Sequence, residues 1–141
     1  MKLPFTLLVF LLGFFGCHAE EPCTNFSLGE PVEIYLGETI SHCEENISIT
    51  FVELISDSRC PANANCIWQG MIEVKIAVAI EGKESTFQLS SEPNYGSKLP
   101  RTQELEGYQI TLENAIPYPV IGQKVNDKDR IVVVSIQKVE E

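Results

Sequence analysis

Alternation of hydrophobic and polar residues predicts β-strands along most of the chain. The clearest example is MIEVKIAVAI, residues 71–80, where every second position from Ile72 to Ile80 is aliphatic and Glu73 and Lys75 lie between. A period of two is that of a strand with one buried face. The same pattern predicts further strands at 31–36, 47–55, 85–90, 108–113 and 130–139. A helical period is not sustained anywhere.

The pattern also indicates where the strands are interrupted. Within 47–55 the hydrophobic positions shift from Phe51 to Val52 and Leu54, which predicts a β-bulge. EGK at 81–83 is typical of a hairpin turn. Residues 91–107 are interpreted as a long loop, and the two prolines of IPYPV, 116–120, predict a crossing segment or a sheet edge.

These elements predict an all-β fold in a single domain. With 141 residues and about seven short strands separated by Gly and Pro, we expect an antiparallel β-sandwich of the immunoglobulin-like kind. A small β-barrel is the alternative. The domain is predicted to span 31–141, preceded by an acidic tether at 17–30.

The N-terminus has the features of an export signal. Lys2 precedes an apolar run to Gly16, which is shorter than the roughly 20 residues of a membrane span. Gly16-Cys17 resembles the lipobox of bacterial lipoproteins, so 1–16 is the expected signal peptide and Cys17 the expected lipidation site. The alternative is cleavage before Glu20, which discards Cys17. The first interpretation predicts a lipid-anchored protein at the outer membrane or cell surface of a bacterium.

The cysteine count favours disulfides over other cysteine chemistry. The chain has 5 cysteines, and if Cys17 is acylated or removed, four can pair. Their spacing predicts Cys60–Cys66, leaving Cys23–Cys43, worth about 2 and 3 kcal/mol by loop entropy. Trp68, two residues beyond Cys66, is expected on the same strand face, packed on the bridge or the core.

The spacing of cysteines and histidines in the chain fits neither a zinc site nor a thioredoxin-type redox site. The two histidines, His18 and His42, lack the spacing of zinc ligands relative to the cysteines. A thioredoxin-type site has two residues between its cysteines, whereas PANAN separates Cys60 from Cys66. We therefore expect neither a metal nor a cofactor.

The charge of the chain excludes one class of partner. From residue 17 on there are 20 acidic residues and 9 basic ones, since Lys2 is one of the 10, which gives a net charge of −11. Such a surface repels nucleic acid. Basic residues are scarce, so their grouping in the 91–107 loop predicts a binding lip of Tyr95, Lys98, Leu99 and Arg101. A solvated connection is the alternative.

The stretch DSRCPANANCIWQG, 57–70, carries a resemblance. It is similar to a group of small, mostly uncharacterised bacterial lipoproteins and secreted domains that share an S-R-C-P…C-x-W-x-G motif. The matching residues here are Ser58, Arg59, Cys60, Pro61, Cys66, Trp68 and Gly70. A hairpin, a Tyr-containing strand, a Pro-x-Pro segment and a β-branched strand follow, so the resemblance covers roughly 30–140. It implies no particular activity.

Two functions remain after these exclusions. Neither a nucleophilic triad nor a positioned pair of carboxylates is present in the sequence, so we expect no enzyme. The first function is a membrane-tethered, non-catalytic envelope lipoprotein, acting as a binding or structural module for an unknown envelope protein or ligand. The alternative is a secreted protease inhibitor that presents the disulfide-bounded loop around Arg59 to a trypsin-like enzyme.

Overall fold

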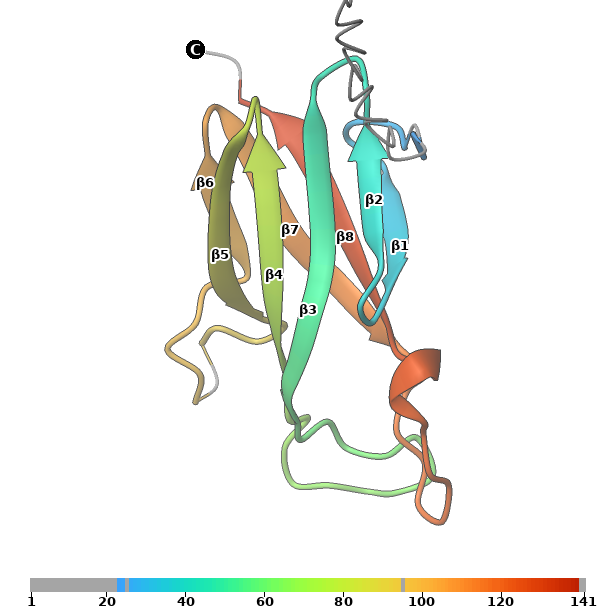
Figure 1. The fold of residues 1–141 in the computed structure, drawn as a ribbon. Coiled ribbons are helices and arrows are strands. Elements are labelled where there is room, and N and C mark those ends of the chain that lie inside the picture. Colours follow the sequence, from blue (N-terminus) through green and yellow to red (C-terminus); the bar gives the residue numbers. More distant parts are fainter. Residues whose placement is uncertain (1–22, 25, 95, 140–141) are drawn as a thin grey trace, which may run out of the picture.

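The fold is that of a computed structural model, which describes residues 23–24, 26–94 and 96–139 (Figure 1). The predicted signal peptide, Cys17 and the first part of the predicted tether lie outside these residues. The strands are β1 (Pro31–Tyr35), β2 (Thr39–His42), β3 (Ile47–Asp57), β4 (Ile72–Ile80), β5 (Lys83–Ser90), β6 (Thr102–Leu105), β7 (Tyr108–Ile116) and β8 (Ile131–Lys138). A short 3₁₀ helix, η1 (Asp127–Asp129), precedes β8.

The strands form two four-stranded antiparallel sheets that pack face to face (Figure 1). The strand orders are β2-β3-β4-β5 and β1-β8-β7-β6. Within the described residues, β1 and β8 are the one pair of hydrogen-bonded strands that are not consecutive in the chain. Immunoglobulin domains differ, because they also pair their second and fifth strands. The predicted β-sandwich is confirmed.

The barrel alternative is wrong because the sheets do not close. Between the sheets, β1 and β3 approach where Leu36 forms an isolated bridge with Phe51 and the Gly37 N–H donates to the Phe51 carbonyl at 2.8 Å. One bridge does not continue the ladder, so the β1 and β2 edges remain separate.

The core lies between the two sheets and follows the predicted alternation. In β4 every second residue from Ile72 to Ile80 is buried, and the residues between them are partly exposed. The opposite sheet contributes the buried side chains Ile34, Tyr108, Ile110, Leu112, Ala115, Val132, Val134 and Ile136. Two inner faces of mainly branched aliphatic residues stabilise the sandwich by removing apolar surface from water.

The predicted bulge in β3 is confirmed. The register between β3 and β4 shifts between Phe51 and Glu53, and again between Leu54 and Ser56. A bulge turns side chains away from the regular alternation. Val52 is consequently exposed, and Leu54 packs against the edge of the core.

The structure has eight strands rather than about seven, and two short ones were not predicted from the sequence. β2 has four residues, and β6 lies within the range 91–107 that was predicted to be a loop. β6, TQEL, is short and polar because it is an edge strand that pairs with β7 alone. Such a strand has no hydrophobic alternation to reveal it.

The folded unit includes described residues ahead of the predicted boundary at residue 31. Cys23 forms a disulfide with Cys43, Phe26 is buried in the core cluster, and the Gly29 N–H donates to the Ile136 carbonyl. These contacts fix the start of the domain to β2 and β8.

The long connecting segments gather at one end of the sandwich. The β2–β3 turn and the end of β8 lie at one end, and the segments 58–71, 91–101 and 117–130 lie at the other, which we call the loop end (Figure 1). The disulfide to Cys43, which follows β2, places Cys23 at the first of these ends. The part of the chain that the structure describes contains no helix that could cross a bilayer.

Candidate functional site

The segment 58–71 extends the β3–β4 hairpin into the loop end. The Ser58 N–H donates to the Met71 carbonyl at 2.8 Å, and the Cys60 N–H donates to the Gln69 carbonyl at 2.8 Å. The predicted disulfide Cys60–Cys66 then closes the tip, with 5.9 Å between the two Cα atoms. The pairing Cys23–Cys43 is also as predicted, and it lies at the opposite end.

Gly70 is required by the close approach of the two arms of this extension. A Cβ atom at this position would lie 1.9 Å from the Ser58 carbonyl oxygen. Its φ of +71° is also in the region that favours glycine. The glycine of the motif therefore allows the ladder to continue past the strand ends.

Arg59 is the centre of the loop end, and its side chain is buried. Nε and one terminal nitrogen of its guanidinium donate to the two carboxylate oxygens of Asp57, at 2.8 and 2.7 Å. The guanidinium also donates to the carbonyls of Ala115 and Pro117, and its carbon lies 4.7 Å from the centroid of the Tyr118 ring. Arg59 thus joins the hairpin extension to the end of β7.

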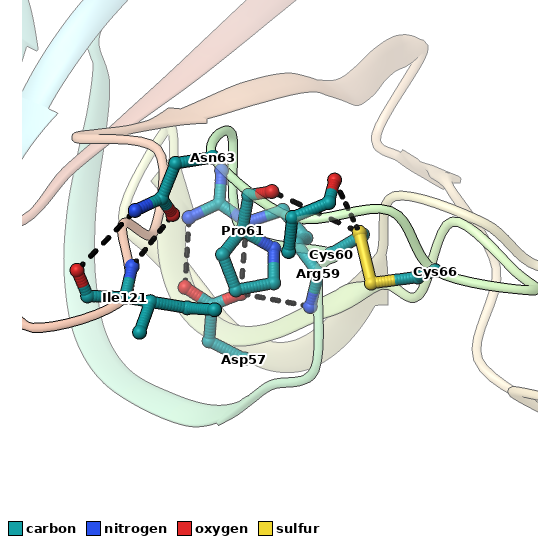
Figure 2. Close-up of a disulfide and its surroundings, with 8 residues drawn as sticks. Asp57, Arg59, Cys60, Pro61, Asn63, Cys66 and Ile121 are labelled. Atoms are coloured by element: carbon teal, nitrogen blue, oxygen red, sulfur yellow. Dashed lines mark hydrogen bonds and ion pairs between the residues drawn. A yellow bond between two sulfur atoms is a disulfide. The ribbon is translucent and has the colours of Figure 1, made fainter.

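A second set of contacts holds 58–71 against the segment 117–130 (Figure 2). The Asn63 amide forms hydrogen bonds with both the N–H and the carbonyl of Ile121, and the Ala62 N–H donates to the Pro119 carbonyl at 2.9 Å. Pro61 follows Cys60 where the segment turns toward this contact. A disulfide, the buried Arg59 and the Asn63 hydrogen bonds together hold 58–71 against the end of β7 and the segment 117–130.

The position of Arg59 gives no support to the protease-inhibitor alternative. A substrate-like arginine must project from its loop to enter the pocket of a trypsin-like enzyme. Arg59 has 8% of its surface exposed, and its donors are directed at Asp57 and at two backbone carbonyls. The residue has a structural role instead.

Trp68 is not where the sequence analysis expected it. Residues 66–70 are not part of a strand, because β4 begins at Ile72, so Trp68 does not share a strand face with Cys66. Its side chain is 54% exposed and Ile67 beside it is fully exposed. Trp68 therefore neither caps the core nor packs within it. Within the described residues, its indole forms no hydrogen bond and is not part of the core cluster.

A hollow of 420 Å³ lies beside Trp68, lined by Ile67, Trp68, Gln69, Gly70 and Glu92. A smaller hollow of 150 Å³ shares Gln69, Gly70 and Glu92 and continues past Arg101 and Tyr118. An aromatic face with a few polar groups in a concave site is typical of ligand-binding surfaces. The segments 58–71 and 91–101 thus form one candidate binding surface.

The predicted binding lip is only partly assembled at this surface. Arg101 lines the smaller hollow, but its guanidinium donates to the carbonyls of Leu112 and Glu113. Lys98 is exposed, Leu99 is half-buried, and neither lines the two hollows. Tyr95 lies outside the described residues. The role of these four residues as a lip stays a prediction.

Sequence reasoning missed Ile67, Gln69 and Glu92. The adjacent pair Ile67-Trp68 was an available signal, since consecutive large apolar residues cannot both face the core of a strand. Glu92 had no such signal, because its position beside Trp68 depends on how two distant segments pack.

The opposite end contains a charged cluster of Glu45, Tyr108 and Lys138. The Tyr108 hydroxyl donates to the Glu45 carboxylate, and Lys138 lies 3.5 Å from the same carboxylate. The Tyr108 hydrogen bond, aided by the Lys138 charge, holds the pKa of Glu45 below its ordinary value. The same hydrogen bond raises the pKa of Tyr108, and the Glu45 charge raises the pKa of Lys138. A tyrosine held protonated in this way serves structure rather than nucleophilic chemistry.

Comparisons with known proteins give no further guide to the site. No protein-family model, curated protein or solved structure matches the chain. The described residues contain no group of three or more potential metal ligands. The two disulfides indicate an oxidising environment outside the cytosol, where such bonds form and persist.

Proposed function

We propose that this protein is a membrane-tethered, non-catalytic lipoprotein of the bacterial cell envelope that binds a partner through its loop end. The observation that carries the proposal is the exposed pair Ile67 and Trp68 beside a hollow, on segments fixed by a disulfide and by Arg59. Large apolar side chains held rigidly in solvent are typical of interaction surfaces.

The arrangement of the two ends supports a tethered module. The first described residue, Cys23, is bonded to Cys43, which follows β2 at the end opposite the loop end. A lipid on Cys17 would therefore attach near that end and direct Trp68 away from the membrane. The resemblance of 57–70 to bacterial lipoproteins and secreted domains, and the Gly16-Cys17 sequence, support the same location at the outer membrane or cell surface.

Anchoring is tested by mass spectrometry of the protein isolated from its native host. We expect the mature chain to begin at an acylated Cys17 and to remain with the membrane fraction. A chain that begins at Glu20 and carries no lipid would refute the tether, and the protein would then be a freely secreted module.

Binding is tested by photo-crosslinking on intact envelopes, with wild type and Trp68→Ala compared. We expect a crosslinked partner that depends on Trp68 and is kept by the matched control Tyr35→Ala, which removes another half-exposed aromatic side chain. A partner captured equally by all three proteins would show that the loop end is not the binding surface.

A further inference from the structure

We propose that the Trp68 hollow binds the basic side chain, lysine or arginine, of a partner protein. This inference rests on the proposed function, in which the loop end is the binding surface, and it specifies the chemistry of what binds there. The hollow beside Trp68, 420 Å³ in volume, is within the range of small-ligand sites.

The lining of the hollow supplies an aromatic face and two oxygen-bearing side chains that suit a bound cation. Tryptophan has the aromatic face that attracts ammonium and guanidinium groups most strongly. Glu92 supplies a carboxylate, and Gln69 supplies an amide oxygen that accepts hydrogen bonds. Within the described residues, neither of these side chains has a hydrogen-bond or ion-pair partner, so both are available to a ligand.

The cations near the hollow do not compete for Glu92. Arg59 is paired with Asp57, and Arg101 donates to β7 carbonyls and lies 3.7 Å from the Glu113 carboxylate. Among the described residues, those that line the hollow include one carboxylate and no basic side chain. A lysine or arginine entering it would therefore meet the Glu92 carboxylate, which has no ion-pair partner within the described residues.

The charge of the whole domain favours the same ligand. A net charge of −11 from residue 17 on, from 20 acidic and 9 basic residues, attracts basic segments and repels acidic ones. A neutral ligand such as a saccharide would gain no affinity from this negative charge. The charge of the domain and the lining of the hollow by Trp68 and Glu92 thus indicate the same class of partner.

Trp68 is the single tryptophan of the chain, so its fluorescence reports directly on the hollow. The purified mature protein is titrated with pentalysine, pentaarginine, pentaglutamate and the neutral saccharide chitotetraose. We expect a saturable change in emission with the two basic peptides and none with the other two. Affinity should fall as NaCl is raised from about 0.05 to about 0.5 M, because exposed charges are screened.

Calorimetric titration with pentaarginine then locates the site. Glu92→Gln and Trp68→Ala should each weaken binding about fivefold or more. The matched control Glu104→Gln should leave the affinity unchanged, since it removes the same charge from the β6 surface near Val139. Trp68→Phe, which keeps an aromatic face, should give an intermediate affinity.

Three results would overturn the inference. Equal weakening by Glu104→Gln and Glu92→Gln would show general attraction to an acidic surface, with no role for the hollow. A response to chitotetraose but not to the peptides would assign the hollow to saccharides and leave the loop end as the binding surface. No response to any probe would refute basic ligands, while envelope crosslinking through Trp68 would still decide the proposed function.

Discussion

Replacing Arg59 by alanine should strongly destabilise the domain, because the guanidinium is buried between three segments. The Arg59 and Asp57 side chains are 6% and 14% exposed, so the substitution leaves a carboxylate that is largely shielded from water. Removing one partner of a buried ion pair costs about 3–5 kcal/mol. The carbonyls of Ala115 and Pro117 also lose their donor, which keeps the expected loss at the upper part of this range.

The assay is urea denaturation of wild type, Arg59→Ala and the matched control Arg130→Ala. Arg130 pairs with Asp127, whose side chain is 83% exposed, so its loss should cost less than about 1 kcal/mol. Against a total stability of about 5–15 kcal/mol for a domain, the two variants are easily separated. A loss below about 1 kcal/mol for Arg59→Ala would refute the structural role of the buried guanidinium.

Three further predictions concern the disulfide, the glycine and the charged cluster. Replacing Cys60 and Cys66 together by serine should lower the free energy of unfolding by about 2 kcal/mol, measured by urea denaturation, and an unchanged midpoint would contradict this. Gly70→Ala should cost about 2 kcal/mol or more through backbone overlap and positive φ, and a near-neutral change in melting temperature would argue against the close approach. The Tyr108 hydrogen bond makes the pKa of Glu45 lower in the folded state than in the unfolded state. The Glu45 carboxylate therefore stabilises the fold at a pH above its pKa in the unfolded state. This contribution is lost as the pH falls through the pKa of Glu45 in the folded state. Melting temperatures of wild type and Tyr108→Phe should therefore converge between neutral and acidic pH, and a constant gap would contradict the linkage.

The fold could be predicted where the sequence alternates strictly. β4 has a period of two from Ile72 to Ile80, and each isoleucine and valine in it is buried as expected. β2 and β6 were missed, because four-residue edge strands with polar side chains differ little from loops. Phe26 was assigned to a tether for a related reason, since a single apolar residue in a polar segment carries no period.

The candidate site was predicted less well than the fold. The disulfides followed from cysteine counting and spacing, which depend on the sequence alone. The burial of Arg59 and the exposure of Trp68 reverse what residue type suggests, because arginine is usually exposed and tryptophan usually buried. The burial of Arg59 follows from the docking of 58–71 on the end of β7, a contact between segments more than fifty residues apart.

The central claim is that the motif at 57–70 builds a rigid support and leaves Trp68 free for a partner. The free energy of unfolding of Trp68→Ala, measured by urea denaturation, tests it most directly. For a side chain that is 54% exposed we expect a loss of less than about 1 kcal/mol, with the native fold retained. A loss of about 3–5 kcal/mol, typical of a buried tryptophan, would show that Trp68 packs within the domain and would contradict the account.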